Sequence, residues 1–392
     1  MRATPGFLGY SQRMGAPPRT TSAKPQVKIV DETSAKHLKR LLSLAFLIPA
    51  LLTPPAVLGA DYVEQYGLTP ASPAIDLGTQ PHGYPSGVIG AVMRHDRLMN
   101  EALAKLGTPL RSHPFRRGAD MIPLLADQRL EAGLIGDVPT ILAASRGDVW
   151  IVGLVKQTST SIVAKGEIQV RNLAGKRIAY VDTSSAHHTL LQGLRSAGLS
   201  EADVTLVAMP VDQMPDALEA GKIDAFAAWE PAPTAALARS AKNRTVFRGL
   251  SSDYFVISKA FEKRLPESAR ILIAGYFRAI EWMRRSQKNL EMAANWAIAD
   301  GRAFSALATE VPVNQVMAIT RREILNIPSA PVILYPAGTP PLQSEFRFLK
   351  EKGKLPENGQ WENIATALSY DGLSKVVGEP RRYELDTFDY VP

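Results

Sequence analysis

The chain has 392 residues, 45% of them hydrophobic and 21% charged, which suits a globular protein of two or three domains with a sizeable core. Residues 1–60 hold eight Lys or Arg against two Asp or Glu, so this segment carries six of the seven net positive charges and the rest carries +1. A nearly neutral body excludes an electrostatic footprint for nucleic acid, and the absence of cysteine excludes disulfides, thiolate metal sites and cysteine nucleophiles.

The N-terminal region has the layout of an export signal. Residues 36–40, "KHLKR", are basic and precede the uncharged apolar run of residues 41–60, which ends in small residues at Gly59 and Ala60. A membrane anchor is the alternative, because the run approaches the length that spans a bilayer, but three prolines interrupt it. We therefore expect residues 1–60 to be a leader with a signal peptide cleaved near Gly59 or Ala60, and the mature protein to be periplasmic.

From residue 74 onward, strand-like and helix-like segments alternate, which predicts an α/β fold with a mainly parallel sheet covered by helices. We expect strands at residues 74–78, 110–115, 134–136, 149–155, 177–181, 204–209 and 225–229. We expect helices at residues 88–106, 120–132, 139–146, 267–285, 289–299 and 312–325. Residues 331–345 read as a proline-rich loop, and the polar tail after Gly378 is expected to wrap the surface.

One internal repeat is visible. Residues 130–137, "LEAGLIGD", and residues 218–225, "LEAGKIDA", share a helix end, a glycine and the start of a strand. Gly133 and Gly221 each fit the left-handed position that ends a helix. A common helix ending is the alternative explanation, but the strand after each copy favours two similarly wound α/β lobes.

A cluster of small polar residues interrupts the stretch "YVDTSSAHHTLLQGL", residues 180–194, where a strand gives way to a helix. Thr183, Ser184 and Ser185 stand where the unpaired amides at a helix beginning suit an anion, and their hydroxyls add further donors. A simple N-cap is the alternative for any one of them. Three hydroxyls followed by two histidines favour a binding site.

Polar residues also follow other predicted strands, at residues 79–84, 136–139, 157–161 and 229–231. In an open α/β sheet, ligands bind outside the carboxyl ends of the strands, so these segments are expected to line one crevice. Each is weak by itself, because Asp137 with Pro139 is ordinary helix capping and Trp229 is more often a core residue.

The same residues support a catalytic site less well than a binding site. Ser184 or Ser185 with His187 and Asp182 contains the ingredients of a hydrolase, but residues this close along one turn rarely adopt the geometry of a triad, and there is no G-x-S-x-G motif. Adjacent histidines point to different faces of a helix, so a zinc pair is not expected. We expect no enzyme, metal or cofactor, with an exported hydrolase as the alternative.

Three segments together resemble the substrate-binding proteins of ABC importers for aliphatic sulfonates, taurine and nitrate, over roughly residues 74–330. They are "LEAGLIGDVPTILAASRGD", "VRNLAGKRIAYVDTSSAHHTLLQGLRSAGLSEADV" and "DALEAGKIDAFAAWEPAPTAAL". The sulfonate branch is the most similar: its Gly-Ser-Ser-Ala-His-Asn pattern corresponds to residues 183–188, "TSSAHH", and its Trp-Asp-Pro to residues 229–231, "WEP".

The resemblance implies a two-lobed periplasmic binding protein fold of type II, in which two mixed, mainly parallel sheets are joined by two crossover hinge segments. Lobe one would comprise residues 61–163 plus 256–392, and lobe two residues 164–255. The ligand would lie between the lobes and be buried by hinge closure.

The resemblance also implies the ligand contacts. From lobe one they would be Gln80, His82, Gly136, Asp137, Thr158 and Ser159. From lobe two, the turn of Ser184, Ser185, Ala186 and His187 would bind an oxyanion. Trp229 would cover the apolar part, and Glu230 would accept from an amine or from the N–H of a neighbouring residue. Related branches bind vitamin precursors, flavins or bicarbonate, and these stay open because Thr183 and His188 depart from the sulfonate pattern.

The implied role is that of a monomeric receptor that delivers a small organic anion to an ABC permease and its ATPase. A ligand-sensing ectodomain is the alternative. One enzyme of the same superfamily makes the thiamine pyrimidine, but it relies on a cysteine cluster that this chain lacks.

Overall fold

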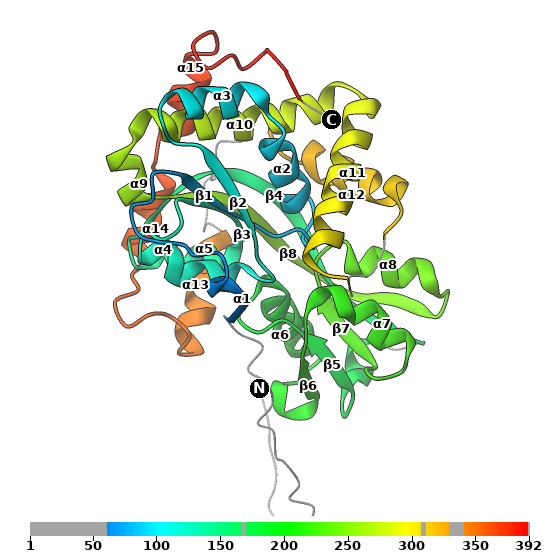
Figure 1. Cartoon of the computed structure of the whole chain (residues 1–392). Coiled ribbons are helices and arrows are strands. Elements are labelled where there is room, and N and C mark those ends of the chain that lie inside the picture. The colour runs from blue at the N-terminus through cyan, green and yellow to red at the C-terminus, as the bar shows by residue number, and fades with distance from the viewer. Residues whose placement is uncertain (1–60, 167–168, 307–310, 329–340, 391–392) are drawn as a thin grey trace, which may run out of the picture. The chain divides into compact units, whose positions relative to one another are not determined.

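The computed structural model describes residues 61–166, 169–306, 311–328 and 341–390, so the predicted leader and its cleavage site near Gly59 or Ala60 lie outside it. In this part of the chain the strands form one eight-stranded sheet in the order β2-β1-β3-β8-β4-β7-β5-β6 (Figure 1). The strands are β1 Ile75–Thr79, β2 Leu110–Pro114, β3 Ala132–Gly136, β4 Val149–Lys165, β5 Arg177–Tyr180, β6 Thr205–Ala208, β7 Ala225–Ala228 and β8 Asn243–Ser258. The α/β class is confirmed.

The prediction of two separate sheets is corrected by the long strands β4 and β8. One parallel group consists of β1, β2 and β3 and the other of β5, β6 and β7, while β4 and β8 pair antiparallel with each other and join the two groups. Residues 157–161, expected as a polar strand end, continue β4 because each pairs with a residue of β8. Strand β8 has no counterpart among the predicted elements. Without its pairing partner, the continuation of β4 beyond residue 155 could not be predicted.

Fifteen helices accompany the sheet in the described ranges. They are α1 Asp61–Glu64, α2 Ser86–Arg94, α3 Arg97–Lys105, α4 Ile122–Ala126, α5 Asp137–Ser145, α6 Ser185–Ser196, α7 Met214–Glu219, α8 Ala232–Arg239, α9 Lys259–Arg264, α10 Pro266–Arg285, α11 Gln287–Phe304, α12 Val313–Leu325, α13 Pro341–Glu351, α14 Trp361–Leu368 and α15 Gly372–Gly378. Short 3₁₀ turns lie at Gly118–Met121, Val170–Leu173, Glu201–Asp203 and Val211–Gln213.

Four sequence expectations about helices and turns are corrected. The helix expected at 88–106 is two helices, because the Asp96 carboxylate accepts the N–H of Met99 at 3.0 Å and starts α3. The helix expected at 120–132 ends at Ala126. Gly133 lies inside β3 rather than in a left-handed cap, whereas Gly221 has the expected positive φ of 67°. Residues 341–345 begin helix α13 instead of a loop.

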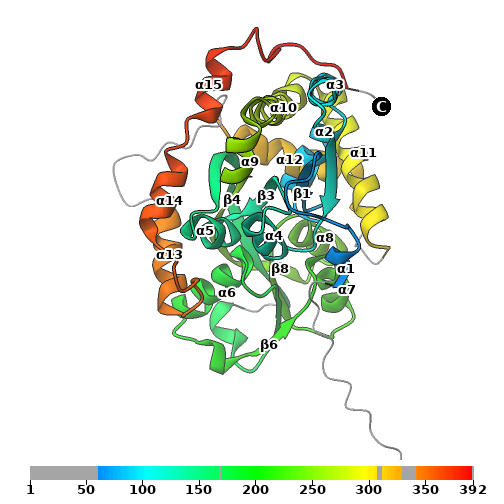
Figure 2. The same cartoon turned by 60° about the vertical axis from the view of Figure 1, so that its left-hand side comes forward.

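Layers of helices cover the sheet. Figure 1 shows α2, α3 and α10 beside the β1–β3 group and α7 and α8 near β7 at the other end. The largest apolar cluster lies under α2, α10 and α11, and includes Val88, Phe255, Ile273 and Ala293. Figure 2 shows α13, α14 and α15 following one another along one flank, where α13 and α14 pack on α5 and α15 packs on α10.

The polar tail packs against the surface through buried contacts. Tyr383 and Leu385 are buried, and the backbone carbonyl of Tyr383 accepts from the Arg278 guanidinium at 2.6 Å. The same guanidinium donates to the fully buried Asp96 carboxylate through Nε at 2.9 Å and is paired with it through Nη2 at 2.8 Å. This ion pair fixes α3, α10 and the tail to one another.

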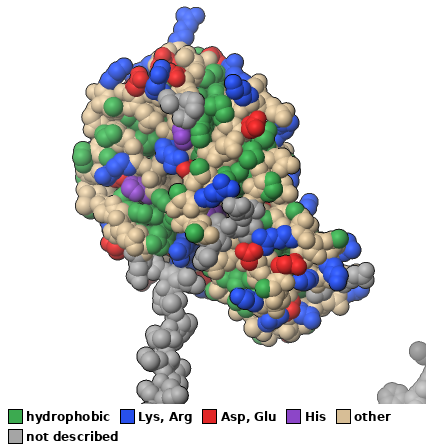
Figure 3. All heavy atoms as spheres, turned by 45° about the vertical axis from the view of Figure 1, so that its right-hand side comes forward, with side chains coloured by type: hydrophobic (Ala, Val, Ile, Leu, Met, Phe, Trp, Pro, Cys, Tyr) green, Lys and Arg blue, Asp and Glu red, His purple; other side chains and the backbone are tan. Residues whose placement is uncertain are grey.

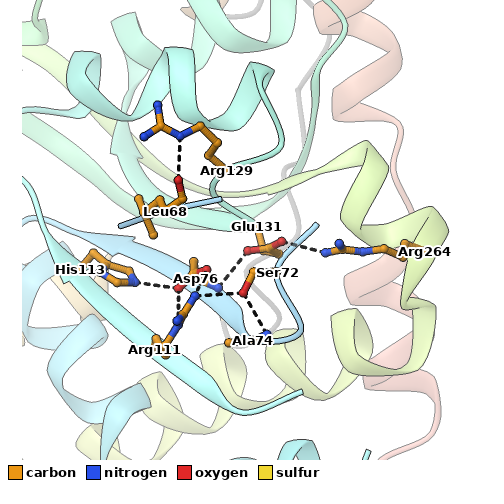
Figure 4. A network of polar contacts seen from close by, with 9 residues as sticks. All are labelled: Leu68, Ser72, Ala74, Asp76, Arg111, His113, Arg129, Glu131 and Arg264. Atoms are coloured by element: carbon orange, nitrogen blue, oxygen red, sulfur yellow. Dashed lines mark hydrogen bonds and ion pairs between the residues drawn. The ribbon is translucent and has the colours of Figure 1, made fainter. Parts of the chain in front are cut away.

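A second buried polar network ties β1 to its two neighbours in the sheet (Figure 4). The fully buried Asp76 carboxylate accepts from Arg111 at 2.7 and 2.8 Å and contacts the His113 ring at 2.7 Å. Glu131 accepts the Asp76 N–H at 3.0 Å and a hydrogen bond from Arg264 at 2.8 Å. Although burial alone would raise the pKa of Asp76, the hydrogen bonds from His113 and Arg111 lower it.

The surface shows no gathering of basic residues on the face drawn in Figure 3, where Lys and Arg side chains are dispersed among apolar, acidic and uncharged groups. Among the helices described, none is long and apolar enough to cross a membrane.

Candidate functional site

A cavity of about 450 Å³ lies where the polar ends of several elements meet. Five predicted site residues line it: Gln80, Gly136, Ser184, Ser185 and Trp229. Thr183, singled out with the two serines, also lines it. The cavity therefore brings together the polar segments after β1, β3, β5 and β7, as expected for the carboxyl ends of strands in an α/β sheet.

The beginning of α6 forms one wall of this cavity. Thr183 has a left-handed φ of 53°, and Ser184 caps the helix with its hydroxyl accepting the N–H of His187 at 3.2 Å. Among the described residues, the N–H groups of Ser185 and Ala186 have no hydrogen-bond partner. The N-cap role of Ser184 is thus real, and it still leaves amide donors for an anion at the positive end of a twelve-residue helix.

Asp137 acts behind the cavity wall. Its carboxylate accepts from the Ser185 hydroxyl, from the N–H of Val138 at 2.7 Å and from the N–H of Ser252 at 3.1 Å. The side chain is buried and does not line the cavity. Asp137 therefore holds Ser185 in place and accepts an N–H in the first turn of α5, rather than presenting a charge to the cavity.

Gly136 allows the walls to approach closely. A Cβ added there would lie 2.8 Å from Ser185 Oγ and 3.6 Å from Asp253 Oδ1. Elsewhere in the cavity wall, the Trp229 indole N–H donates to the backbone carbonyl of His82 at 3.3 Å, which fixes the ring. A side chain at position 136 would occupy the space beside Ser185 and Asp253.

The structure places three other predicted site residues near separate features. His82 lines a second cavity of about 510 Å³, where its ring nitrogens lie 3.7 Å from Asp212 and 3.0 Å from the Gly301 carbonyl. Glu230 pairs with Arg322 at 3.1 Å and caps α8. Ala186 is fully buried in an apolar cluster and is not among the residues that line the cavity.

The remaining three predicted residues also lie outside the 450 Å³ cavity. Thr158 donates a hydrogen bond to Glu323 of α12. Ser159 is in the middle of β4, paired with Leu250. The His187 ring lines a third cavity of about 590 Å³.

The two histidines point to different sides of α6, as expected. The His187 ring lies 3.4 Å from Asp182 and 3.3 Å from Glu201, and burial lowers the pKa of His187 although both carboxylates oppose that shift. His188 packs against Phe348 of α13. No hydrogen bond joins either ring to the hydroxyl of Ser184 or Ser185 in the described structure, so the arrangement of a serine hydrolase is missing.

Several polar residues line the cavity without having been predicted: Ser86, Arg117, Lys156, Ser251 and Asp253. Thr160 also lines it and belongs to residues 157–161, which were expected at the crevice. Lys156 and Asp253 are direct partners across β4 and β8, and Arg117 is held by Asp120 at 2.7 Å. A single lysine directly after the apolar run of residues 149–155 was a signal for an inward-facing charge. Its partner could not be identified without strand β8.

Glu345 of α13 is a buried carboxyl group behind α6. Its Oε1 lies 3.7 Å from His188 Nδ1. Burial, reinforced by nearby Asp137, raises the pKa of Glu345 well above its usual range. The C-terminal helices therefore contribute a buried carboxyl group close to Asp137, the residue that positions Ser185.

Comparison with known proteins points to one group. The model of the NMT1-like family matches residues 100–299, about half of the chain. A putative aliphatic sulfonates-binding protein of Escherichia coli K12 is 30% identical over 162 residues, covering 40% of this chain and 50% of that protein. The taurine-binding periplasmic protein of the same organism is 29% identical over 163 residues, covering 39% and 51%. The chain thus spans about half the length of the curated relatives it matches.

A solved structure shows the same fold. The alkanesulfonate-binding protein SsuA from Xanthomonas axonopodis pv. citri bound to MOPS superposes with a TM-score of 0.58 at 21% identity. The match covers 76% of this chain and 98% of that protein. The α/β architecture described above is therefore the fold of that alkanesulfonate-binding protein.

Proposed function

The chain belongs to the NMT1-like family, and from that membership we propose that it is an exported receptor that captures a small organic anion of the aliphatic sulfonate or taurine type. The observation that carries the proposal is the pair of unpartnered amides at the start of α6, at the wall of a cavity of about 450 Å³. Such amides, with the positive end of the helix dipole, stabilise the oxygens of a bound anion.

We propose that residues 61–163 plus 256–392 form one lobe and residues 164–255 the other. Strands β4 and β8 would carry the chain between them. Contacts across this division support closure over the cavity: the Tyr84 N–H donates to the Glu230 carbonyl at 2.9 Å, and Ser185 donates to Asp137. Hinge closure of this kind buries the ligand and fixes its polar contacts.

The proposed partners are an ABC permease and its ATPase, and the proposed location is the periplasm, with the mature chain a monomer. The two Escherichia coli relatives support this, because both are named as binding proteins, one of them periplasmic, and neither as an enzyme. The predicted contacts of Gln80, Gly136, Ser184, Ser185 and Trp229 with the ligand are part of the same proposal.

Thermal unfolding with added ethanesulfonate, taurine or nitrate tests the proposal. A ligand that binds the folded state raises the melting temperature by mass action, without product formation. Gly136→Ala should abolish the rise, because its Cβ would lie 2.8 Å from Ser185 Oγ. Gly378→Ala is the matched control, since nothing lies within 4 Å of its added Cβ. If none of the three anions shifts the wild-type protein, the proposed function is wrong.

A further inference from the structure

A lysine ammonium group is buried at the wall of the main cavity. Lys156 lies on β4, its side chain is 3% exposed, and it lines the cavity together with Ser251 and Asp253 of the neighbouring strand β8. Removing an ammonium group from water is costly unless close partners replace its hydration. The position therefore requires an explanation.

The partners that Lys156 has are distant. Its Nζ lies 3.4 Å from Ser251 Oγ and 3.6 Å from Asp253 Oδ1, and no third partner exists among the described residues. The buried ion pair between Arg278 and Asp96, by contrast, has contacts of 2.8 and 2.9 Å. Charge-assisted hydrogen bonds of roughly 2.7–2.9 Å are normal for a satisfied pair. The contacts of the Lys156 ammonium group are thus longer than those of a satisfied buried pair.

The other lining charges do not supply what Lys156 lacks. Asp253 is shared, because its second oxygen accepts from the Ser86 hydroxyl at the start of α2. The Arg117 guanidinium is held by Asp120 at 2.7 and 2.8 Å. Of the two cationic side chains that line the cavity, Arg117 and Lys156, only Lys156 has no contact shorter than 3.4 Å in the described structure.

Lys156 also lies close to the amide wall. A Cβ on Gly136 would be 3.6 Å from Asp253 Oδ1, the oxygen nearest Lys156 Nζ, and 2.8 Å from Ser185 Oγ. Lys156 and the beginning of α6 also line the same cavity, together with Gly136. An oxyanion bound in this cavity therefore lies between walls that carry the ammonium group and the first residues of α6.

On the basis of the proposed anion-binding function, we propose that Lys156 is the charge-selecting residue of the cavity. It donates to the acidic head of the ligand, so that the site takes monoanionic sulfonate-type heads and rejects neutral analogues of the same shape. The ligand oxygen becomes its close partner, and the contact with Asp253 is secondary.

The test compares ethanesulfonate with its neutral isostere ethyl methyl sulfone by calorimetric titration. Lys156→Met removes the charge and keeps the length of the side chain. Lys165→Met is the matched control, because Lys165 lies at the far end of the same strand and contacts Glu219 at 3.0 Å outside the cavity. Lys156→Met/Asp253→Asn removes both charges, so that no carboxylate is left unpaired if the single variant folds poorly.

We expect Lys156→Met and the double variant to weaken ethanesulfonate binding at least about tenfold, with sulfone binding unchanged and Lys165→Met equal to wild type. If Lys156→Met binds ethanesulfonate with wild-type affinity, the inference about Lys156 is overturned and the proposed function is not. Recovery of wild-type affinity in the double variant would also overturn the inference, because Lys156 would then serve only to neutralise Asp253. If the wild-type protein does not bind ethanesulfonate, both the inference about Lys156 and the proposed sulfonate-binding function are contradicted.

Discussion

Replacing Asp96 with alanine is expected to be among the most destabilising changes outside the cavity. The carboxylate is fully buried, pairs with Arg278 at 2.8 Å and caps α3 by accepting the Met99 N–H at 3.0 Å. Its removal leaves the guanidinium of Arg278, itself 3% exposed, without a counter-charge. An uncompensated buried charge costs about 3–5 kcal/mol and a lost cap about 1 kcal/mol, and since the two overlap we expect a loss of about 4 kcal/mol.

The assay is equilibrium unfolding in urea followed by circular dichroism. Asp96→Asn keeps an oxygen for the Met99 N–H and loses the charge, so it should be less destabilising than the alanine variant by about 1 kcal/mol. Asp371→Ala is the control, because its pair with Lys375 is 60% and 55% exposed and is worth at most about 1 kcal/mol. A loss in Asp96→Ala no larger than in the control would refute the reasoning that this pair fixes α3, α10 and the tail.

Two further predictions concern pH. Burial alone would raise the pKa of Asp76, but His113 and Arg111 lower it. The Asp76 carboxylate therefore stabilises the fold at pH values above its ordinary pKa of 3.8, and this stabilisation is lost as the pH falls through the lowered pKa. Asp76→Asn should flatten the acid limb of the unfolding free energy, and an unchanged limb would contradict this. Burial and Asp137 raise the pKa of Glu345, so stability should fall as pH rises from its ordinary 4.5 toward the raised value. Glu345→Gln should abolish that fall in melting temperature, whereas a persisting fall would assign it to other groups.

Much of the fold was predictable because its strands are short apolar runs bounded by polar turns. The strands predicted at residues 177–181, 204–209 and 225–229 begin and end within one residue of β5, β6 and β7. Strand β8 was missed because "NRTVFRGLSSDYFVIS" mixes arginines, serines and a glycine with its apolar residues. That composition suits a strand whose pairing partner, β4, is itself polar along residues 157–161.

The candidate site was predictable where it depends on local chain geometry. Thr183, Ser184 and Ser185 precede a helix, and a helix beginning can be recognised from sequence. The direction of a long side chain depends on tertiary packing, so His82 and His187 could not be assigned to their separate cavities. The meeting of Lys156 with Asp253 depends on the register of two strands about a hundred residues apart in the chain, which no local pattern reveals.

Strands β4 and β8 form a continuous two-stranded ribbon through the whole sheet, with register shifts near Gly153, Lys156 and Val163. A turning of one half against the other would have to be absorbed as a change in the coiling of this ribbon, spread over many peptide units, instead of as a bend at one loop. Such a change in coiling would strain the main-chain hydrogen bonds between β4 and β8, and this strain would oppose the rotation. The restoring torque back to the resting geometry would come from the backbone itself.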